Sequence, residues 1–235
     1  YALVLPWSFA CMSFLLLIGL VPGSTGWLHW FERRIWAPNW LRLCGVRLKV
    51  TGEVDKLDPD RGYVFVSNHQ GYFDIPAIKT ALGEHSILFV TKRSLLYVPI
   101  GGWYLWRSGY PLINRKNRAQ SAGVLDAATD ALRRGQSMVV FPEGTRTKTG
   151  NIGPFKSGAF RMAIAAQAPI VPVTLTGSMA VMGRGLAVKA GCIHIHIGEP
   201  IGTEGTTLED RTQLGETVKA SISKSYEIQQ NRAKA

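Results

Sequence analysis

Past residue 50 the chain alternates between short apolar runs and longer stretches with helical periodicity. The runs are rich in Val, Ile and Phe and almost free of charge, which is typical of strands buried in a sheet. The expected strands are residues 63–68, 86–91, 137–141, 169–177 and 189–201, the last with one wetter face because it alternates. Strands separated by helices imply βαβ units, so we expect an α/β fold with a mostly parallel central sheet flanked by helices.

Three stretches between and after these strands have the character of helices. Residues 117–135 are Ala-rich and end on Gly135, a common residue at helix C-termini. Residues 157–168 are expected to form a second helix. The tail, residues 206–230, places Leu214, Val218, Ile222 and Tyr226 at intervals of four, which predicts a terminal amphipathic helix.

The first segment of the chain is almost wholly apolar. Residues 1–28 contain no Asp, Glu, Lys or Arg. The apolar run between Pro6 and Pro22 is shorter than the ~20 residues that a membrane-spanning helix needs. A signal peptide is the other short option, but no basic stretch precedes the run.

A second segment, residues 27–50, alternates Trp and Leu with arginines, as in a helix that lies in the head-group region of a membrane. We therefore expect residues 1–48 to form an N-terminal membrane-associated two-helix hairpin dipped into one leaflet, and residues 49–235 to form the α/β domain. The alternatives are a full membrane span and a hydrophobic helix packed on the domain's own core.

Charge and composition narrow the partners. Lys and Arg outnumber Asp and Glu by 27 to 16, a net charge of +11, which favours nucleic acid, phospholipid head groups or phosphorylated substrates. Much of the tryptophan lies in the first forty residues rather than among basic residues of a strand. This arrangement suits a membrane interface and not base stacking, so we expect no nucleic acid partner. The three cysteines lack metal-ligand spacing, which favours a reducing, cytoplasmic setting.

The stretch "SNHQGYFDIP" places His69 at the end of an expected strand and Asp74 near the start of the next helix. The carboxyl edge of an open α/β sheet is where such folds keep reactive groups. Asp74 either turns back to His69, fixing its tautomer and making it a general base, or caps free amides of the helix. The motif alone leaves both roles open. A base of this kind needs no Ser or Cys nucleophile.

Three further stretches follow in order along the chain: "GYPLINR" at 109–115, "FPEGTR" at 141–146 and "VPV" at 171–173. With "NHQGYFD" they match the ordered blocks Asn-His-x4-Asp, Gly-x-x-x-Ile-x-Arg, Phe-Pro-Glu-Gly-Thr-Arg and Val-Pro-Val. The sequence thus resembles the glycerolipid acyltransferase family, of the 1-acylglycerol-3-phosphate type. The resemblance spans residues 68–173 and leaves out the N-terminal hairpin and the C-terminal tail.

The resemblance implies a role for each block. His69 supported by Asp74 would be the base, and Arg115 and Arg146 would clamp a phosphate. A carboxylate repels phosphate, so Glu143 is expected to orient an arginine or to bind the glycerol hydroxyl. The other expected substrate-binding residues are Gly144, which allows close backbone approach, Thr145 beside it, and the secondary phosphate candidates Lys92 and Lys156.

The implied reaction moves a fatty acyl group from an acyl thioester, acyl-CoA or acyl-ACP, to the hydroxyl of lysophosphatidic acid, giving phosphatidic acid. The alternative is a glycerol-3-phosphate or other lysophospholipid acyltransferase. No metal and no cofactor beyond the thioester co-substrate are expected, since His194 and His196 share a strand face without a third ligand. The expected location is the cytoplasmic face of a membrane, the bacterial inner membrane.

Overall fold

The structure is a computed structural model that describes residues 4–114, 118–182 and 187–234. Its centre is a six-stranded sheet in the order β1-β8-β7-β2-β6-β3. Neighbouring strands are parallel except for β7 and β8, which are antiparallel, so the expected mostly parallel sheet is confirmed. The strands are β1 (Val46–Gly52), β2 (Val64–Ser67), β3 (Ile87–Phe89), β6 (Ser137–Val140), β7 (Ile170–Thr176) and β8 (Gly191–Ile197), and a separate parallel pair joins β4 (Thr91–Lys92) and β5 (Leu112–Ile113).

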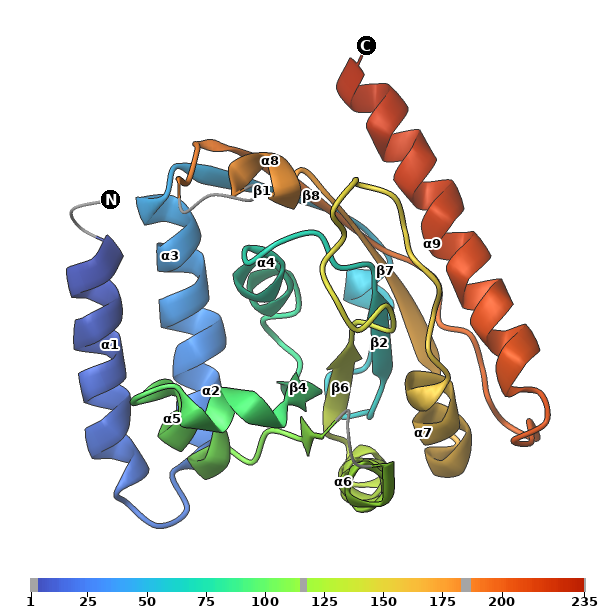
Figure 1. Cartoon of the computed structure of the whole chain (residues 1–235), viewed down its shortest axis with the longest axis horizontal. Helices are drawn as coiled ribbons and strands as arrows, with labels where there is room; N and C mark the ends of the chain where they lie inside the picture. The colour runs from blue at the N-terminus through green and yellow to red at the C-terminus, as the bar shows by residue number, and fades with distance from the viewer. Residues whose placement is uncertain (1–3, 115–117, 183–186, 235) are drawn as a thin grey trace.

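Helices flank both faces of the sheet (Figure 1). On one side lies α4 (Asp74–Ala81) with the N-terminal helices outside it, and on the other lie α7 (Gly158–Ala166) and α9 (Arg211–Lys234). The helix α6 (Arg118–Arg133) packs against α7. The shorter pieces are the 3₁₀ turns Val54–Lys56 and Arg93–Tyr97, α5 (Gly101–Arg107) and α8 (Ser178–Val181).

Burial explains the strand pattern. The strand β2 is buried along its whole length and β7 along nearly all of it, because helices cover both of their faces. In β8 the isoleucines at 193, 195 and 197 are buried while His194 and His196 are only half-buried, which confirms the wetter face. In α9, Leu214, Val218 and Ile222 are buried, so the amphipathic stripe packs as expected.

The predicted strands at β2, β3, β6, β7 and β8 and the predicted helices at α6, α7 and α9 are confirmed. Gly135 follows α6 with φ +86°, and its N–H bonds to the carbonyl of Leu132. One sequence interpretation is wrong: the predicted hairpin extends to residue 48, but residues 46–48 belong to β1. This strand exists because it pairs in parallel with β8, which is remote in the sequence.

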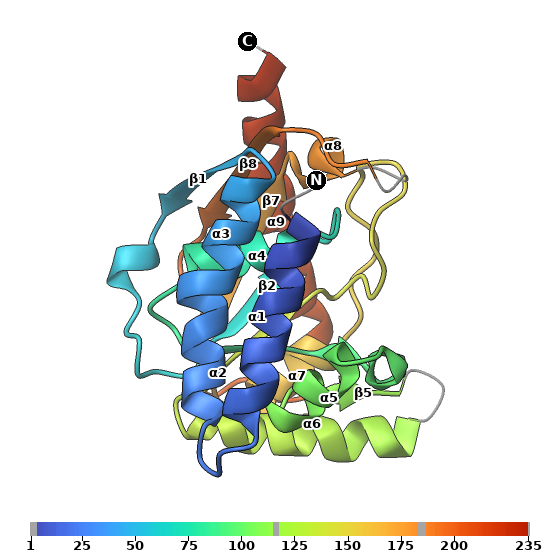
Figure 2. The ribbon, with the colours of Figure 1, turned by 90° about the vertical axis from the view of Figure 1, so that its left-hand side faces the viewer.

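The N-terminal helices form a hairpin in which α1 (Val4–Gly19) runs beside a second helical rod (Figure 2). The rod consists of α2 (Thr25–Phe31), the π-helical segment Glu32–Trp36 and α3 (Ala37–Leu43). Pro38 has no N–H to continue the α-helical pattern, and the N–H of Ala37 bonds to the carbonyl of Glu32 instead.

One side of the hairpin belongs to the core of the α/β domain, since Leu15, Leu28 and Leu41 are part of its buried apolar cluster. The other side exposes large apolar residues, among them Leu17 and Trp27. Within the described ranges, no helix combines the length and the apolar character needed to cross a bilayer.

A buried polar cluster joins the hairpin to α4. The ammonium of Lys79 donates to Glu32 Oε2 and to the hydroxyl of Tyr110, both at 2.7 Å, and that hydroxyl donates to Glu32 Oε2 at 2.6 Å. The side chains of Lys79 and Glu32 are only 3% and 9% exposed, so the ion pair is almost free of solvent. Glu32 lies in the hairpin and Lys79 in α4, whose first residue is Asp74.

The carboxyl group of Glu32 is ionised at neutral pH. Burial by itself would raise the pKa of the Glu32 carboxyl, but the Lys79 ammonium and contacts with His29 hold that pKa at about 2. Burial, followed by the charge of Glu32, raises the pKa of Tyr110 well above its usual value. The Tyr110 hydroxyl therefore keeps the proton that it donates to Glu32.

We predict that Glu32→Gln lowers the free energy of unfolding by about 3–5 kcal/mol at neutral pH, because Lys79 stays buried without a counter-charge. The pKa of the Glu32 carboxyl falls from an ordinary 4.5 to about 2 on folding. Its ionisation therefore stabilises the fold fully above pH 4.5, and this contribution is lost as the pH falls toward 2. Urea unfolding in a mild detergent at neutral pH and at about pH 3 should show the difference from the wild type shrinking with acid.

Two controls make this prediction specific. Glu204→Gln removes a surface partner of Arg61 and should cost only about 0–1 kcal/mol. Adding Lys79→Met to Glu32→Gln should recover much of the lost stability, since no unpaired charge is then buried. Equal stability of wild type and Glu32→Gln at neutral pH would contradict the assignment.

Candidate active site

The strand β2 delivers His69 to the carboxyl edge of the sheet. Asn68, directly after the strand, is buried and bonds to both backbone groups of Leu175 in β7, with its side-chain nitrogen 2.9 Å from the carbonyl oxygen and its side-chain oxygen 2.8 Å from the amide. These two bonds fix the end of β2 just before the histidine. This explains why the motif begins with asparagine.

The imidazole of His69 meets the carboxylate of Asp74. The distance from Nδ1 to Oδ2 is 2.6 Å, and Asp74 is completely buried at the first position of α4. The same Oδ2 accepts the backbone N–H groups of Gln70 at 2.7 Å and Gly71 at 2.9 Å. Asp74 therefore holds the turn before the helix and orients the imidazole at once.

The second nitrogen of the ring is left for chemistry. Because a carboxylate can only accept, Nδ1 carries the proton toward Asp74, and Nε2 is the nitrogen that can take a proton from a substrate. The ring stacks on Phe141, with 4.0 Å between the centroids and 13° between the planes. The side chain is 17% exposed, which is enough for a substrate to reach it.

The "FPEGTR" loop holds the backbone of His69 on both sides. Glu143 Oε1 accepts the N–H of His69 at 2.8 Å, and the N–H of Thr147 donates to the carbonyl of His69 at 2.8 Å. The other oxygen of Glu143 accepts the N–H of Gly153 at 2.9 Å. Among the described contacts Glu143 holds two backbone amides and no arginine, so its observed part is to position the histidine.

At the tip of this loop, the side chain of Lys156 lies close to Gly144. Gly144 has φ +73°, and a Cβ built there would lie 2.9 Å from the Lys156 ammonium nitrogen. A side chain at Gly144 would therefore displace the end of the lysine side chain.

The cationic end of the loop is exposed. Thr145 and Arg146 are both open to solvent, and the guanidinium carbon of Arg146 lies 3.6 Å from the centroid of the Tyr72 ring. Stacking holds the planar group by its face and leaves its N–H edges available. Arg115, the other expected clamp, lies outside the described residues.

A cavity of about 310 Å³ surrounds the histidine. Most of the expected site residues share its wall, namely His69, Lys92, Gly144, Thr145 and Arg146. Lys156 lines a neighbouring cavity of about 160 Å³, which has Phe141 and Gly144 in common with the first. The structure thus gathers residues that lie far apart in the sequence around one imidazole.

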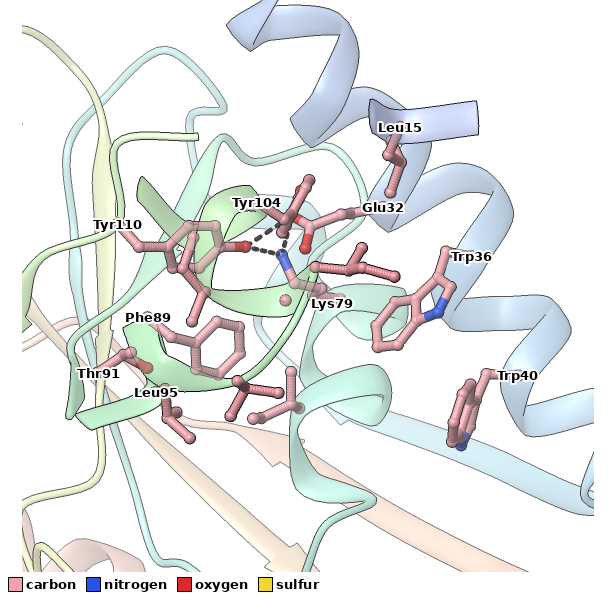
Figure 3. A pocket seen from close by; sticks show the side chains of 15 residues that line it. Leu15, Glu32, Trp36, Trp40, Lys79, Phe89, Thr91, Leu95, Tyr104 and Tyr110 are labelled. Atoms are coloured by element: carbon pink, nitrogen blue, oxygen red, sulfur yellow. Dashed lines mark hydrogen bonds and ion pairs between the residues drawn. The ribbon is translucent and has the colours of Figure 1, made fainter. Parts of the chain in front are cut away.

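An apolar groove of about 380 Å³ continues from this cavity (Figure 3). The two spaces have Ile75, Phe89, Thr91 and Leu95 in common. The groove runs between the hairpin, which contributes Leu15, Trp36 and Trp40, and α5, and the cluster of Lys79, Glu32 and Tyr110 forms its polar part. An aliphatic chain is the kind of group that this lining accepts.

The sequence analysis missed one residue that acts on the site from α9. The hydroxyl of Tyr226 accepts the side-chain amide of Gln70 at 2.7 Å and donates to the carbonyl of Gly150 at 2.7 Å. It thereby joins the turn after His69 to the loop after Arg146. Tyr226 was noted only as the fourth member of the apolar stripe, and its hydroxyl at that position was the available signal.

Across the described ranges, no three His, Cys, Asp or Glu side chains gather as ligands for a metal ion. His196, one of the strand histidines, lies with Nδ1 3.2 Å from the hydroxyl of Thr51.

Known proteins are similar to this chain in sequence and in fold. A family model described as "Acyltransferase" matches residues 47–176, more than half of the chain. The 1-acyl-sn-glycerol-3-phosphate acyltransferase alpha of Mus musculus is 32% identical over 183 residues, which cover 77% of this chain and 64% of the mouse protein. The 1-acyl-sn-glycerol-3-phosphate acyltransferase of Saccharomyces cerevisiae is 29% identical over 81% of this chain and 63% of its own.

The chain spans less than two thirds of the length of these curated relatives. Among solved structures, the 1-acyl-sn-glycerophosphate (LPA) acyltransferase PlsC of Thermotoga maritima superposes with a TM-score of 0.77 over 93% of this chain and 88% of that one, at 22% identity. The fold of that enzyme is therefore the fold of this protein. Because the family model matches more than half of the chain, including the histidine motif, the chain belongs to the acyltransferase family.

Proposed function

We propose that the protein is an O-acyltransferase that moves a fatty acyl group from an acyl thioester to the free hydroxyl of 1-acylglycerol-3-phosphate, giving phosphatidic acid. One observation carries the proposal: His69, paired with the buried Asp74, lines a cavity that combines cationic side chains, Lys92 and Arg146, with entry to an apolar groove. A base, a phosphate clamp and an acyl slot are what this reaction needs. The names of the relatives support the same substrate.

In the proposed reaction, Nε2 of His69 takes the proton of the glycerol hydroxyl as its oxygen attacks the thioester carbonyl carbon. The buried charge of Asp74 stabilises the imidazolium that forms. The carbon–sulfur bond then breaks, and the departing thiolate takes the proton from Nε2. The histidine returns to its starting state without an acyl-enzyme.

The acceptor phosphate is assigned to Arg146, whose stacked guanidinium offers two parallel N–H donors, with Lys92 as a second cation on the same wall. Arg115 is proposed as a further clamp from its place in the sequence motif. Lys156 is proposed to meet a phosphate of the donor, acyl-CoA or acyl-ACP. The apolar groove is proposed to hold an acyl chain.

We further propose that the enzyme works at the cytoplasmic face of a membrane, the bacterial inner membrane, with the hairpin in one leaflet. The exposed side of the hairpin supports this, because Phe9, Leu17 and Trp27 face solvent in the isolated chain. A lipid acceptor would then reach His69 without exposing its chain to water, which costs ~0.8 kcal/mol per methylene. The alternative acceptor, glycerol-3-phosphate, has no acyl chain and would gain nothing from an embedded hairpin.

The acceptor assignment is tested by comparing kcat/KM for 1-acylglycerol-3-phosphate and for glycerol-3-phosphate, with one acyl-CoA donor in mixed micelles. We expect a clear preference for the lipid acceptor, because the groove and the hairpin can contact only an acyl chain, which glycerol-3-phosphate lacks. A preference for glycerol-3-phosphate would contradict the assignment.

The base is tested by His69→Ala, which should lower turnover by about 10²-fold or more. Asp74→Asn should also lose turnover, since its oxygen can still accept the Gln70 and Gly71 amides but carries no charge to stabilise an imidazolium. Thermal unfolding of each variant serves as the control for folding. Near-normal turnover by folded His69→Ala protein would remove the histidine from the mechanism.

The phosphate clamp is tested by Arg146→Ala, which should cost about 2–5 kcal/mol in kcat/KM for the phosphorylated acceptor. Arg146→Lys should recover little, because an ammonium cannot make two parallel bonds. Arg61→Ala, a change at an exposed arginine paired with Glu204, is the matched control and should have no effect. An equal loss with the neutral acceptor monoacylglycerol would show that Arg146 does not act on the phosphate.

A further inference from the structure

A second part of the chain, residues 95–106, exposes large apolar side chains as the hairpin does. Tyr97 is 85% exposed and Trp106 is 66% exposed, and Leu95, Val98 and Ile100 are exposed as well. Isolated exposed apolar residues are ordinary, but five within one short segment form a patch.

The segment is compact, so these side chains project from a fixed backbone. The N–H of Gly102 bonds to the carbonyl of Val98 at 2.7 Å, and a side chain at Gly102 would collide with the carbonyl of Leu96. Ile100 has φ +64°, a conformation that a β-branched residue adopts only when its surroundings impose it.

The segment is fastened to the tip of the hairpin. A Cβ at Gly19, the last residue of α1, would collide with the ring of Trp103, so the glycine permits direct contact between α1 and α5. The guanidinium of Arg107 donates to the carbonyls of Gly19 at 2.6 Å and Val21 at 2.8 Å and to the hydroxyl of Thr25 at 3.1 Å. The apolar surfaces of the hairpin and of the segment therefore move as one body.

The stretches of sequence that flank the segment carry charge of one sign. No Asp or Glu occurs between Glu84 and Asp126, whereas six Lys and Arg residues do: Lys92, Arg93, Arg107, Arg115, Lys116 and Arg118. Lys92 and Arg93, which directly precede the patch, are exposed. An apolar surface bordered by cations matches a bilayer with anionic lipids better than it matches a neutral apolar partner.

The apolar groove lies between the two surfaces. Trp36 and Trp40 line it from the hairpin, and Leu95, Val98 and Ile100 line it from the segment. Because the last three also face solvent, they form part of its rim. A leaflet that covered both sides would let an acyl chain pass between lipid and groove without crossing water.

We propose that residues 95–106 form a second membrane-inserting element, which binds one leaflet containing anionic lipid together with the hairpin. Tyr97 and Trp106 lie among the lipid chains or at their boundary with the head groups, where amphipathic aromatic rings are favoured. This proposal rests on the proposed membrane location of the enzyme. It adds a membrane contact made by the α/β domain itself.

The test measures binding of the purified full chain to phosphatidylcholine vesicles with and without phosphatidylglycerol. Tyr97→Ser and Trp106→Ser should each lower binding by about tenfold, the effect of losing one large inserted side chain. The matched controls are Leu208→Ser, shortly before α9, and Ile228→Ser, within α9, which remove exposed apolar side chains. The helix α9 lies on the side of the molecule away from α1 (Figures 1 and 2). The controls should bind as the wild type does.

Depth is measured by quenching of tryptophan fluorescence with brominated phosphatidylcholine. The difference between wild type and Trp106→Phe isolates the signal of Trp106, and we expect that signal to be quenched. Unchanged vesicle binding by both serine variants, or an unquenched Trp106, would overturn the proposal. A dimer in detergent that becomes a monomer in these variants, with vesicle binding unchanged, would assign the surface to a second copy of the chain and would overturn it too.

Turnover with a short-chain, water-soluble 1-acylglycerol-3-phosphate separates this proposal from the proposed function. The Tyr97→Ser and Trp106→Ser proteins should keep wild-type turnover with the soluble acceptor and lose it with an acceptor embedded in vesicles. If the proposed function is wrong, the wild type itself shows no turnover with either acceptor, while the vesicle-binding results still decide the membrane contact.

Discussion

The site depends on one oxygen atom. Oδ2 of Asp74 accepts the ring N–H of His69 and the backbone N–H groups of Gln70 and Gly71, and the residue is wholly buried. Charge at that position is favoured by the N-terminus of α4, where the helix dipole is positive. The carboxylate thus shapes the turn that carries His69 and also sets the tautomer of its imidazole.

The helix α4 extends this constraint beyond the site. Asp74 begins the helix, and Lys79 one turn later forms the buried ion pair with Glu32 of the hairpin. A single short helix therefore contacts both His69 and the hairpin segment that lines the groove. Because a buried ion pair is costly to break, the hairpin is held in one position relative to His69.

Two loops complete the support of His69. Asn68 fixes the end of β2 to β7, and the loop that contains Glu143 bonds to the backbone of His69 on both sides. Tyr226 then joins these loops from α9, which the family model does not reach. The tail of the chain is therefore part of the support of the active site, although it contributes no reacting group.

The sequence by itself determined most strands of the main sheet and the helices α6, α7 and α9, because buried strands and amphipathic helices are encoded in local patterns of apolar residues. It also placed His69 and Asp74 near one another, but it left open whether Asp74 caps the helix or turns back to the histidine. Only the tertiary structure decided what depends on partners remote in the chain: β1, which exists through pairing with β8, and the roles of Glu143 and Tyr226. The sequence shows Glu143 within a motif and Tyr226 within an apolar stripe, but neither position reveals a hydrogen-bond partner. Those partners are fixed only when the folded chain brings remote residues together.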